Sequence, residues 1–344
     1  VHVFKEEDWS FKNVSNVPQW QNDNIWDFID ISVNPNNPEQ YAVASYSEKP
    51  LTIFTGDSVN VFDDSNSTLA FTGIENGWSL ASGVRYDAQN NLWVLNGYTE
   101  RPLNVLRPDG SWFNFDCGSS ARNIYTTKMI VDFNDNIWFA SEEHGLFGYN
   151  HNNTIDDESD DEYIHVYTGV NSGNLPSPNV TAIAADFDGE IWVGTDAGFA
   201  ILYNAANTFA GNAGDFDVQR VKVTFEGNVE YVLGNTHITD IEVDGGNRKW
   251  VATANAVEFV GAKVKFVDVD ETFNINCDLI EAAITPKTKA IIVVHMYGAP
   301  ARMTPILDLA KKYKLKVVED VAPAIGAKWN GKSCGTFGDF GAYS

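Results

Sequence analysis

The feature that most constrains this fold is a short strand pattern built around tryptophan, which recurs four times before residue 254 and then stops. The four copies are Asn91-Leu-Trp93-Val, Asn136-Ile-Trp138-Phe, Glu190-Ile-Trp192-Val and Arg248-Lys-Trp250-Val. Their tryptophans are 45, 54 and 58 residues apart, and Tyr41 extends the series backwards. Spacings of this size suit one four-stranded propeller blade per repeat. The pattern predicts an all-β propeller of about five blade units over residues 1–253.

The segments between these strands predict tight hairpin turns. Asp186-Phe-Asp188-Gly189 lies between two apolar strands, where an Asp-Gly pair is a strong hairpin signal. This segment and Asp132-Phe-Asn134-Asp-Asn136 lack the downstream glutamate of a calcium loop, so we predict Asx-stabilised turns. One tryptophan per repeat on the same strand predicts core packing rather than a sugar-stacking surface. The acidic run at 156–162 is expected to be a solvated inter-blade loop rather than a cation site.

Charge is distributed unevenly along the 344 residues. Residues 254–344 hold 11 of the 23 basic and 10 of the 47 acidic residues, which leaves 12 basic and 37 acidic residues in 1–253. The resulting charge of −25 on the first part repels nucleic acid, so no nucleic-acid partner is expected. The apolar runs are too short to span a bilayer, and three widely spaced cysteines support neither a disulfide framework nor a metal site.

Two stretches of the first part resemble a known family. Leu175-Pro-Ser-Pro-Asn-Val-Thr-Ala-Ile, with its Asp-Gly-x-Ile-Trp-Val-Gly-Thr turn, is similar to the two-component-regulator propellers. Residues 224–234 and 241–250 resemble more closely the PorZ-like propellers of the type IX secretion system of Bacteroidetes. The resemblance covers roughly residues 26–253 and implies a secreted or surface-associated module that binds protein or glycan partners. Such propellers normally need more than five blades for closure, so the array is expected to be incomplete.

After residue 254 the pattern changes to alternating strands and helices. The expected elements are a strand at 264–268, a short helix at 277–283, a strand at 289–295, a helix at 303–313 and a strand at 315–320. The strand at 289–295 is continuously apolar, as in parallel sheets covered on both faces. This alternation predicts βαβ units. The chain is therefore expected to be multidomain, with an α/β segment at 254–344 after the propeller at 1–253.

Two polar residues stand at the ends of the predicted strands. His295 closes the strand at 289–295 and Asp320 ends the last one, and ligands of open α/β sheets bind outside the carboxyl ends of the strands. An aspartate at the end of a buried strand is costly unless it meets a cation or several donors. A buried structural ion pair and a cofactor contact both explain it, and the residues alone leave the two open.

The α/β segment resembles a second family through an ordered set of motifs. These include Phe266-Val-Asp-Val-Asp270, Val294-His-Met-Tyr-Gly298, Val318-Glu-Asp320 and Gly338-Asp-Phe-Gly-Ala-Tyr-Ser344. They are similar to the DegT/DnrJ/EryC1/StrS nucleotide-sugar aminotransferases, pyridoxal-phosphate enzymes of fold type I that are usually homodimeric and cytoplasmic. The match implies that Asp320 pairs with the pyridinium nitrogen of the cofactor and Ser344 binds its phosphate. His295 is a further cofactor-binding candidate with no assigned role, and Pro323, where the family often has glutamine, is assigned nothing.

The same resemblance indicates what the segment lacks. The family's Schiff-base lysine normally lies five residues beyond the serine that Ser344 matches, and transamination without that amine has neither covalent anchor nor base. Lys263, Lys265 and Lys332 stand at positions that the family does not use and are interpreted as surface charges. No catalytic residue is assigned, and the segment as it stands is expected not to catalyse.

The two patterns meet inside a repeat, at Val251-Ala-Thr-Ala-Asn255, without the polar linker that usually separates domains. An artificial or accidental join is therefore favoured, with an open propeller edge and an exposed apolar sheet. The leading hypothesis is a composite chain, a truncated propeller module followed by an incomplete aminotransferase segment. Two alternatives remain: a working transaminase whose lysine lies beyond residue 344, and a binding protein with a structural tail. The two resemblances also imply different locations. The propeller family is exported or found at the cell surface, and the aminotransferase family is cytoplasmic.

Overall fold

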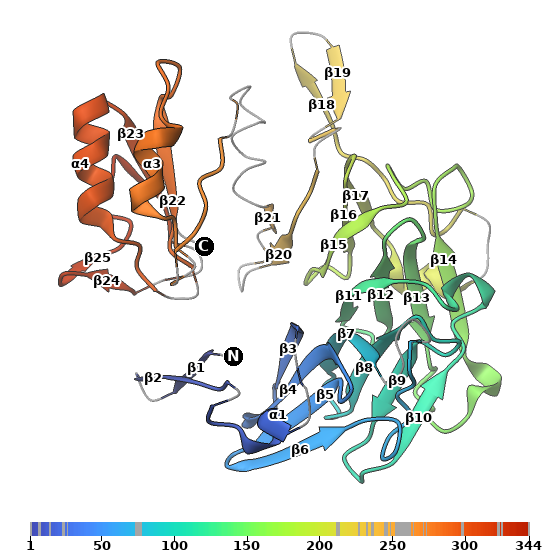
Figure 1. The fold of residues 1–344 in the computed structure, drawn as a ribbon. Coiled ribbons are helices and arrows are strands. Elements are labelled where there is room, and N and C mark those ends of the chain that lie inside the picture. The colour runs from blue at the N-terminus through green and yellow to red at the C-terminus, as the bar shows by residue number, and fades with distance from the viewer. Residues whose placement is uncertain are drawn as a thin grey trace. The chain divides into compact units, whose positions relative to one another are not determined.

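The structure is a computed structural model of the chain. It describes residues 2–5, 8–13, 15–22, 25, 27–72, 78–210, 214–225, 228–231, 233–234, 237–243, 247, 249–251, 263, 265–270, 272, 274–296, 299–321, 324 and 326–342. The chain forms two compact units, residues 1–243 with 249–252, and residues 244–248 with 253–344 (Figure 1). The first unit is built from β-sheets and the second is an α/β unit.

The first unit contains a series of antiparallel sheets, each made of consecutive strands, which we number as blades 1 to 5. Blade 1 contains β3 (Phe28–Asn34), β4 (Asn37–Ser47), β5 (Leu51–Thr55) and β6 (Ser58–Phe62), and blade 2 contains β7 (Ser79–Tyr86), β8 (Leu92–Gly97), β9 (Leu103–Leu106) and β10 (Trp112–Phe115). Blade 3 contains β11 (Thr126–Val131), β12 (Ile137–Ser141), β13 (Gly145–Asn150) and β14 (Glu162–Val166). Blade 4 contains β15 (Val180–Ala185), β16 (Ile191–Thr195) and β17 (Gly198–Leu202), and blade 5 contains β20 (Ile241–Val243) and β21 (Lys249–Val251). The all-β propeller architecture predicted from the repeats is confirmed.

The blades follow one another through their first strands. β3, β7, β11, β15 and β20 each contact the next strand in this series. The end of β4 also pairs with the start of β7, which joins blades 1 and 2 into one sheet. On β3, Asp30 accepts a hydrogen bond from the backbone N–H of Val84 at 3.0 Å, and the Ser32 hydroxyl accepts one from the N–H of Tyr86 at 3.1 Å. Polar side chains of one first strand thus bind the backbone of the next.

A shared hydrogen-bond motif closes the first hairpin of blades 2, 3 and 4. In each, an aspartate accepts bonds from the backbone N–H groups two and four residues later, at 2.8 to 3.0 Å. The same carboxylate accepts the indole N–H of the tryptophan six residues later, at 2.9, 2.9 and 3.1 Å. These aspartates are Asp87, Asp132 and Asp186, all buried. The predicted Asx turns are confirmed.

The turn geometry explains the residue types in these hairpins. The residue three positions after each aspartate has a positive φ, and these residues are Asn90, Asp135 and Gly189. Asparagine, aspartate and glycine are the residues that adopt this left-handed conformation at least cost. Local backbone preference and the buried aspartate therefore specify the same turn.

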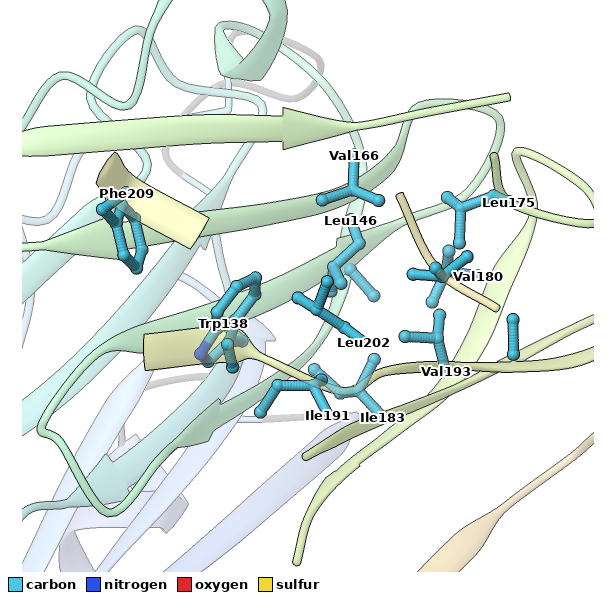
Figure 2. Packing of buried hydrophobic residues seen from close by; sticks show 14 residues of the cluster. Trp138, Leu146, Val166, Leu175, Val180, Ile183, Ile191, Val193, Leu202 and Phe209 are labelled. Atoms are coloured by element: carbon cyan, nitrogen blue, oxygen red, sulfur yellow. The ribbon is translucent and has the colours of Figure 1, made fainter. Parts of the chain in front are cut away.

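Apolar clusters fill the space between neighbouring blades. Between blades 3 and 4, Trp138 and Val166 pack with Ile183 and Val193 (Figure 2). Trp138 is fully buried there, and Trp93 occupies the equivalent place between blades 2 and 3. The prediction that the repeated tryptophans are core residues is confirmed for these two blades.

One face of blade 1 is covered by a short segment rather than by a blade. Trp20 of α1 (Pro18–Asn22) lies against Phe54, with ring centroids 5.5 Å apart. Ile31 and Val33 of β3 lie opposite Val43 and Tyr41 of β4 and so belong to this face. The segment leaves them 44% and 54% exposed. Part of the apolar face of blade 1 is therefore exposed. The open edge and exposed sheet predicted at the join, residues 251–255, fall almost wholly outside the described residues.

The remaining elements of the first unit are small. Two hairpins form separate sheets, β1 (His2–Lys5) with β2 (Asp8–Phe11), and β18 (Lys222–Phe225) with β19 (Asn228–Tyr231). The described loops of this unit include the 3-10 helices η1 (Ser119–Ala121), η2 (Glu158–Asp160) and η3 (Ala205–Ala210).

The second unit is organised around a parallel sheet. Its strand order is β22 (Ala290–Val294), β23 (Lys316–Asp320) and β26 (Phe340–Ala342). Two helices, α3 (Cys277–Ala283) and α4 (Met303–Tyr313), contribute to its apolar core, and β24 (Lys328–Trp329) pairs with β25 (Lys332–Ser333). The helices predicted at 277–283 and 303–313 and the strands predicted at 289–295 and 315–320 are confirmed to within a residue at each end.

The strand predicted at 264–268 is wrong for the described residues 265–268. The chain turns back on itself here, because the C=O of Asp268 accepts the N–H of Asn276 and the N–H of Asp270 binds the C=O of Asn274, both at 2.9 Å. A strand needs a neighbour for its backbone groups, and the C=O of Asp268 binds within the turn instead.

Candidate functional site

The carboxyl ends of three parallel strands meet at one edge of the α/β unit. The register aligns Val294 of β22, Asp320 of β23 and Ala342 of β26. The N–H of His295 donates to the C=O of Asp320 at 3.0 Å, which fixes the chain leaving β22 beside the end of β23. Ser344 follows β26 but lies outside the described residues, as does Pro323. The structure thus brings His295 and Asp320 to one edge, where ligands of parallel α/β sheets bind.

His295 is completely buried at this edge, and both ring nitrogens have partners. Its Nδ1 accepts the backbone N–H of Ala301 at 3.0 Å. The proton therefore sits on Nε2, which donates to the Glu319 carboxylate at 3.2 Å. The ring holds the chain after β22 in place, and its part in cofactor binding stays a prediction.

Glu319 is a carboxylate with four hydrogen-bond donors, and it was not among the residues predicted for the site. Besides His295, three backbone N–H groups at 335–338 donate to it, each at 2.7 Å, and the residue is completely buried. The donors belong to Gly335, Phe337 and Gly338. This carboxylate ties the loop that leads into β26 to the carboxyl-terminal end of β23. The sequence holds one signal for this buried carboxylate. Glu319 alternates with Val317 and Val321, so it falls on the inward face of a buried strand.

Asp320 lies on the opposite face of β23 from Glu319, because side chains alternate along a strand. It is partly exposed at the carboxyl end of the strand. A carboxylate at this position fits one end of pyridoxal phosphate, since it can accept a hydrogen bond from a protonated ring nitrogen. The exposed side chains of Lys263, Lys265 and Lys332 confirm their interpretation as surface charges.

On the first unit, the tips of the first hairpins touch from blade to blade. Asn36 Nδ2 donates to the C=O of Ala88 at 3.0 Å, and Gln89 Nε2 donates to Asp135 at 3.2 Å. Phe133 and Phe187 continue the series, with ring centroids 5.5 Å apart and exposed fractions of 64% and 54%. We call these tips, at residues 36, 88–90, 133–135 and 187–189, the tip surface. It runs across blades 1 to 4 and ends in an aromatic pair.

A cleft of about 420 Å³ opens beside the tip surface. Its lining comes from the hairpin turns of blade 2 and from the loop between β13 and β14 of blade 3, and comprises Gln89, Asn91, Arg107, Pro108, Asp109, Asn153, Ile155 and Asp156. Gln89 belongs to both the cleft and the tip surface. Amides, carboxylates and one guanidinium thus stand next to exposed aromatic rings.

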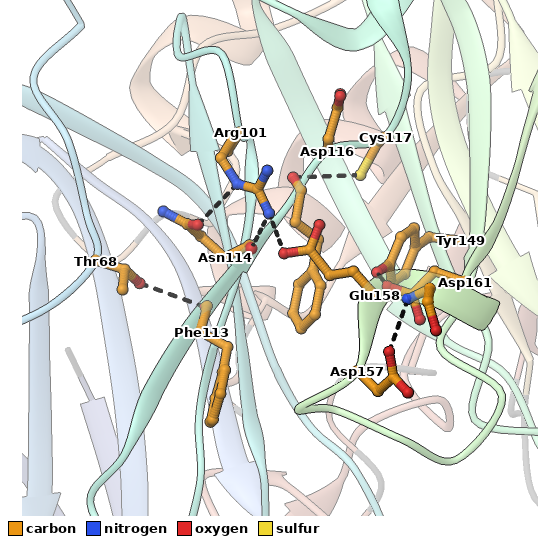
Figure 3. A network of polar contacts seen from close by, with 12 residues as sticks. Thr68, Arg101, Phe113, Asn114, Asp116, Cys117, Tyr149, Asp157, Glu158 and Asp161 are labelled. Atoms are coloured by element: carbon orange, nitrogen blue, oxygen red, sulfur yellow. Dashed lines mark hydrogen bonds and ion pairs between the residues drawn. The ribbon is translucent and has the colours of Figure 1, made fainter.

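Arg101 binds the outer strand of blade 2 to a loop of blade 3 (Figure 3). Its guanidinium donates to Oδ1 of Asn114 at 2.8 Å and to the C=O of Asn114 at 2.6 Å, and it forms an ion pair with Glu158. The hydrogen bond to Glu158 raises the pKa of Arg101. Asp161 of the same loop accepts a hydrogen bond from the hydroxyl of Tyr149 on β13, and burial raises the pKa of that carboxyl.

The acidic run at 156–162 is mostly exposed, as expected, but its predicted inter-blade position is wrong. It connects β13 to β14 within blade 3, and Glu158 of the run forms an ion pair with Arg101 of blade 2. Asp157 accepts the N–H of Ser159 at 3.0 Å and so caps η2. The sequence could not place this run, because the weakly apolar β14 that follows it carries little strand signal.

Comparisons with known proteins match two parts of the chain to different families. The DegT/DnrJ/EryC1/StrS aminotransferase family matches residues 242–344, and the two component regulator propeller repeat matches residues 174–197. The chain joins a propeller module to a partial sugar-aminotransferase segment. This is the composite that the two resemblances indicate.

Curated relatives of the α/β segment include enzymes of nucleotide-linked sugars. UDP-N-acetyl-3-dehydro-α-D-glucosamine 3-aminotransferase of Acidithiobacillus ferrooxidans is 56% identical over 96 residues, 28% of this chain and 26% of the relative. GDP-perosamine synthase of Caulobacter vibrioides is 46% identical over 96 residues, with the same coverage of 28% and 26%. The chain spans about a quarter of the length of these relatives.

A solved structure resembles the propeller module. PorZ, a bacterial surface component of the type-IX secretion system of Porphyromonas gingivalis, is 25% identical with a TM-score of 0.59, over 65% of this chain and 31% of PorZ. Among the helices that the structure describes, none has the length and apolar character to cross a membrane.

Proposed function

We propose that residues 1–253 act as an exported or surface interaction module that binds a protein or glycan partner. The observation that carries this proposal is the series of packed blades that resembles PorZ over 65% of the chain. The tip surface is the part best suited to a partner. Phe133 and Phe187 offer exposed apolar rings there, and the amides of the neighbouring cleft supply hydrogen-bond donors and acceptors.

Cell fractionation tests the location. We expect antibodies against the propeller to detect the chain in the envelope or surface fraction of the source cells, and proteinase added to intact cells to remove it. A cytoplasmic aminotransferase subunit serves as the control and should resist the proteinase. Recovery of the chain only in the cytoplasm, protected together with that control, would contradict the proposal.

We further propose that the α/β segment does not transaminate as it stands. Bound pyridoxal phosphate supplies an electron sink for such chemistry. Asp320 would accept a hydrogen bond from the ring N–H and keep that nitrogen protonated, while His295 and Glu319 hold the surrounding loops. These residues make one side of a site, and the segment corresponds to only about a quarter of its relatives' length.

An activity assay tests this second proposal. The purified chain, supplied with pyridoxal phosphate, an amino donor and a nucleotide-linked keto-sugar, is expected to give no turnover, whereas the relative from Acidithiobacillus ferrooxidans serves as the positive control. Turnover that is lost in Asp320→Asn and kept in Asp308→Asn, an exposed aspartate on α4, would contradict it. That result would favour the alternative of a working transaminase.

A further inference from the structure

Two cations share one aromatic ring at the base of the β18–β19 hairpin. The guanidinium carbon of Arg220 lies 4.0 Å from the centroid of the Tyr231 ring, and Nζ of Lys222 lies 5.5 Å from it. Lys222 is paired with Tyr231 across the two strands, and Arg220 precedes it by two residues and so extends the same face. Tyr231 is 44% exposed, so the group is open to solvent.

The charges of this group are not balanced by any ion pair with a described residue. Other cations of the same unit have carboxylate partners, namely Lys49 with Asp63, Arg85 with Asp30, Arg101 with Glu158 and Arg122 with Asp116. Acidic residues are abundant, since 37 lie in residues 1–253. Two like charges held over one ring repel each other, and the ring's negative face offsets only part of that repulsion.

The guanidinium also has unused hydrogen-bonding capacity. Its Nε is buried and finds no acceptor among the described residues. The terminal nitrogen Nη2 of Arg220 lies close to the backbone at two glycines. A Cβ built on Gly198 or Gly234 would stand 3.6 Å or 3.3 Å from this nitrogen. Arginine presents several N–H donors in a planar fork that matches a carboxylate or phosphoryl group. An acceptor with two or three oxygens would bind the terminal N–H groups of this fork and the nearby ammonium together.

We propose that Arg220, Lys222 and Tyr231 form a binding site for an oxyanion, a carboxylate or a phosphoryl group carried by the partner of the module. This deepens the proposed function of the propeller by naming the chemistry of one contact, and it rests on that function. Tyr231 holds the two cations over one ring, and the oxyanion occupies the solvent side of the pair. A carboxylate source and a phosphoryl source share this chemistry and are distinguished by the test below.

Titration calorimetry of the full chain at low ionic strength tests the site with inorganic phosphate and with acetate. We expect measurable binding of at least one anion, and the preferred one identifies the source. Arg220→Met with Lys222→Met, which keeps the apolar stems, should weaken that binding at least about tenfold. Lys128→Met removes an exposed cation from β11 of the same unit and should leave binding unchanged.

Thermal unfolding supplies the second readout and shows that the variants fold. The preferred anion should raise the Tm of the unaltered chain, and Lys222→Met alone should raise the Tm without anion because it removes the repulsion. Equal anion binding in the double variant, or no binding of either anion to the unaltered chain, would overturn the proposal. Because both probes are free anions, such a failure is distinct from a failure of the module to find its partner.

Discussion

Glu319→Ala is expected to unfold the α/β unit. The substitution leaves three backbone N–H groups and the Nε2–H of His295 without an acceptor in a completely buried position. Each buried donor left unsatisfied costs roughly 1–3 kcal/mol, so the total is comparable with the whole stability of a small domain. Circular dichroism and urea titration should show loss of the helical signal from α3 and α4 at denaturant concentrations that the unaltered chain tolerates.

Two further substitutions distinguish the loss of the hydrogen bonds of Glu319 from the general effect of removing one carboxylate. Glu319→Gln keeps the shape but presents an amide NH2 to two of the four donors, so it should be intermediate. Glu281→Gln removes an exposed carboxylate that pairs with Lys312 at the surface and should change the urea midpoint little. Equal midpoints for Glu319→Ala and Glu281→Gln would show that the carboxylate does not hold the loop at 335–338.

Trp138→Ala is expected to destabilise the propeller unit by about 3–5 kcal/mol, the range for truncating a large buried aromatic residue. The indole is fully buried between blades 3 and 4, so its removal leaves a cavity beside Ile183 and Val193. It also removes the donor that binds Asp132 at 2.9 Å. Thermal unfolding followed by near-ultraviolet circular dichroism should show a markedly lower Tm for this unit.

Two variants divide this effect into packing and hydrogen bonding. Trp138→Phe keeps much of the apolar volume and loses the indole N–H, so it should lie between Trp138→Ala and the unaltered chain. Phe133→Ala removes an aromatic ring from the tip of the same hairpin, where it is 64% exposed, and should leave the Tm nearly unchanged. A Tm for Trp138→Ala as high as that for Phe133→Ala would contradict the packing between blades.

Much of the propeller could be predicted because its signals are local. Repeat spacing, strand alternation and turn residues such as Gly189 lie within a few positions of one another, and the structure follows them. The bond from the Trp138 indole to Asp132 spans only six residues, yet the sequence does not say which partner a buried aspartate binds. The packing of Trp20 on blade 1 was not predicted for a different reason, since it joins segments far apart in the chain.

The α/β unit shows the same limit more strongly. Its helices and two strands followed from apolar spacing, but the environment of Glu319 depends on a loop that returns from residues 335–338. The group formed by Arg220, Lys222 and Tyr231 likewise exists only once β18 and β19 pair. The sequence predicts a strand at 265–268 because Phe266 and Val267 are apolar, and the hydrogen bonds of the turn at 268–276 show otherwise.

Hydrogen exchange measured by mass spectrometry on Glu319→Ala tests most directly that two separate folding units share this chain. Protection should disappear from peptides within 274–342 and persist in the blades at 27–72 and 78–210. Loss of protection in both regions together would contradict the account, because it would mean that the aminotransferase-like segment is an integral part of the propeller.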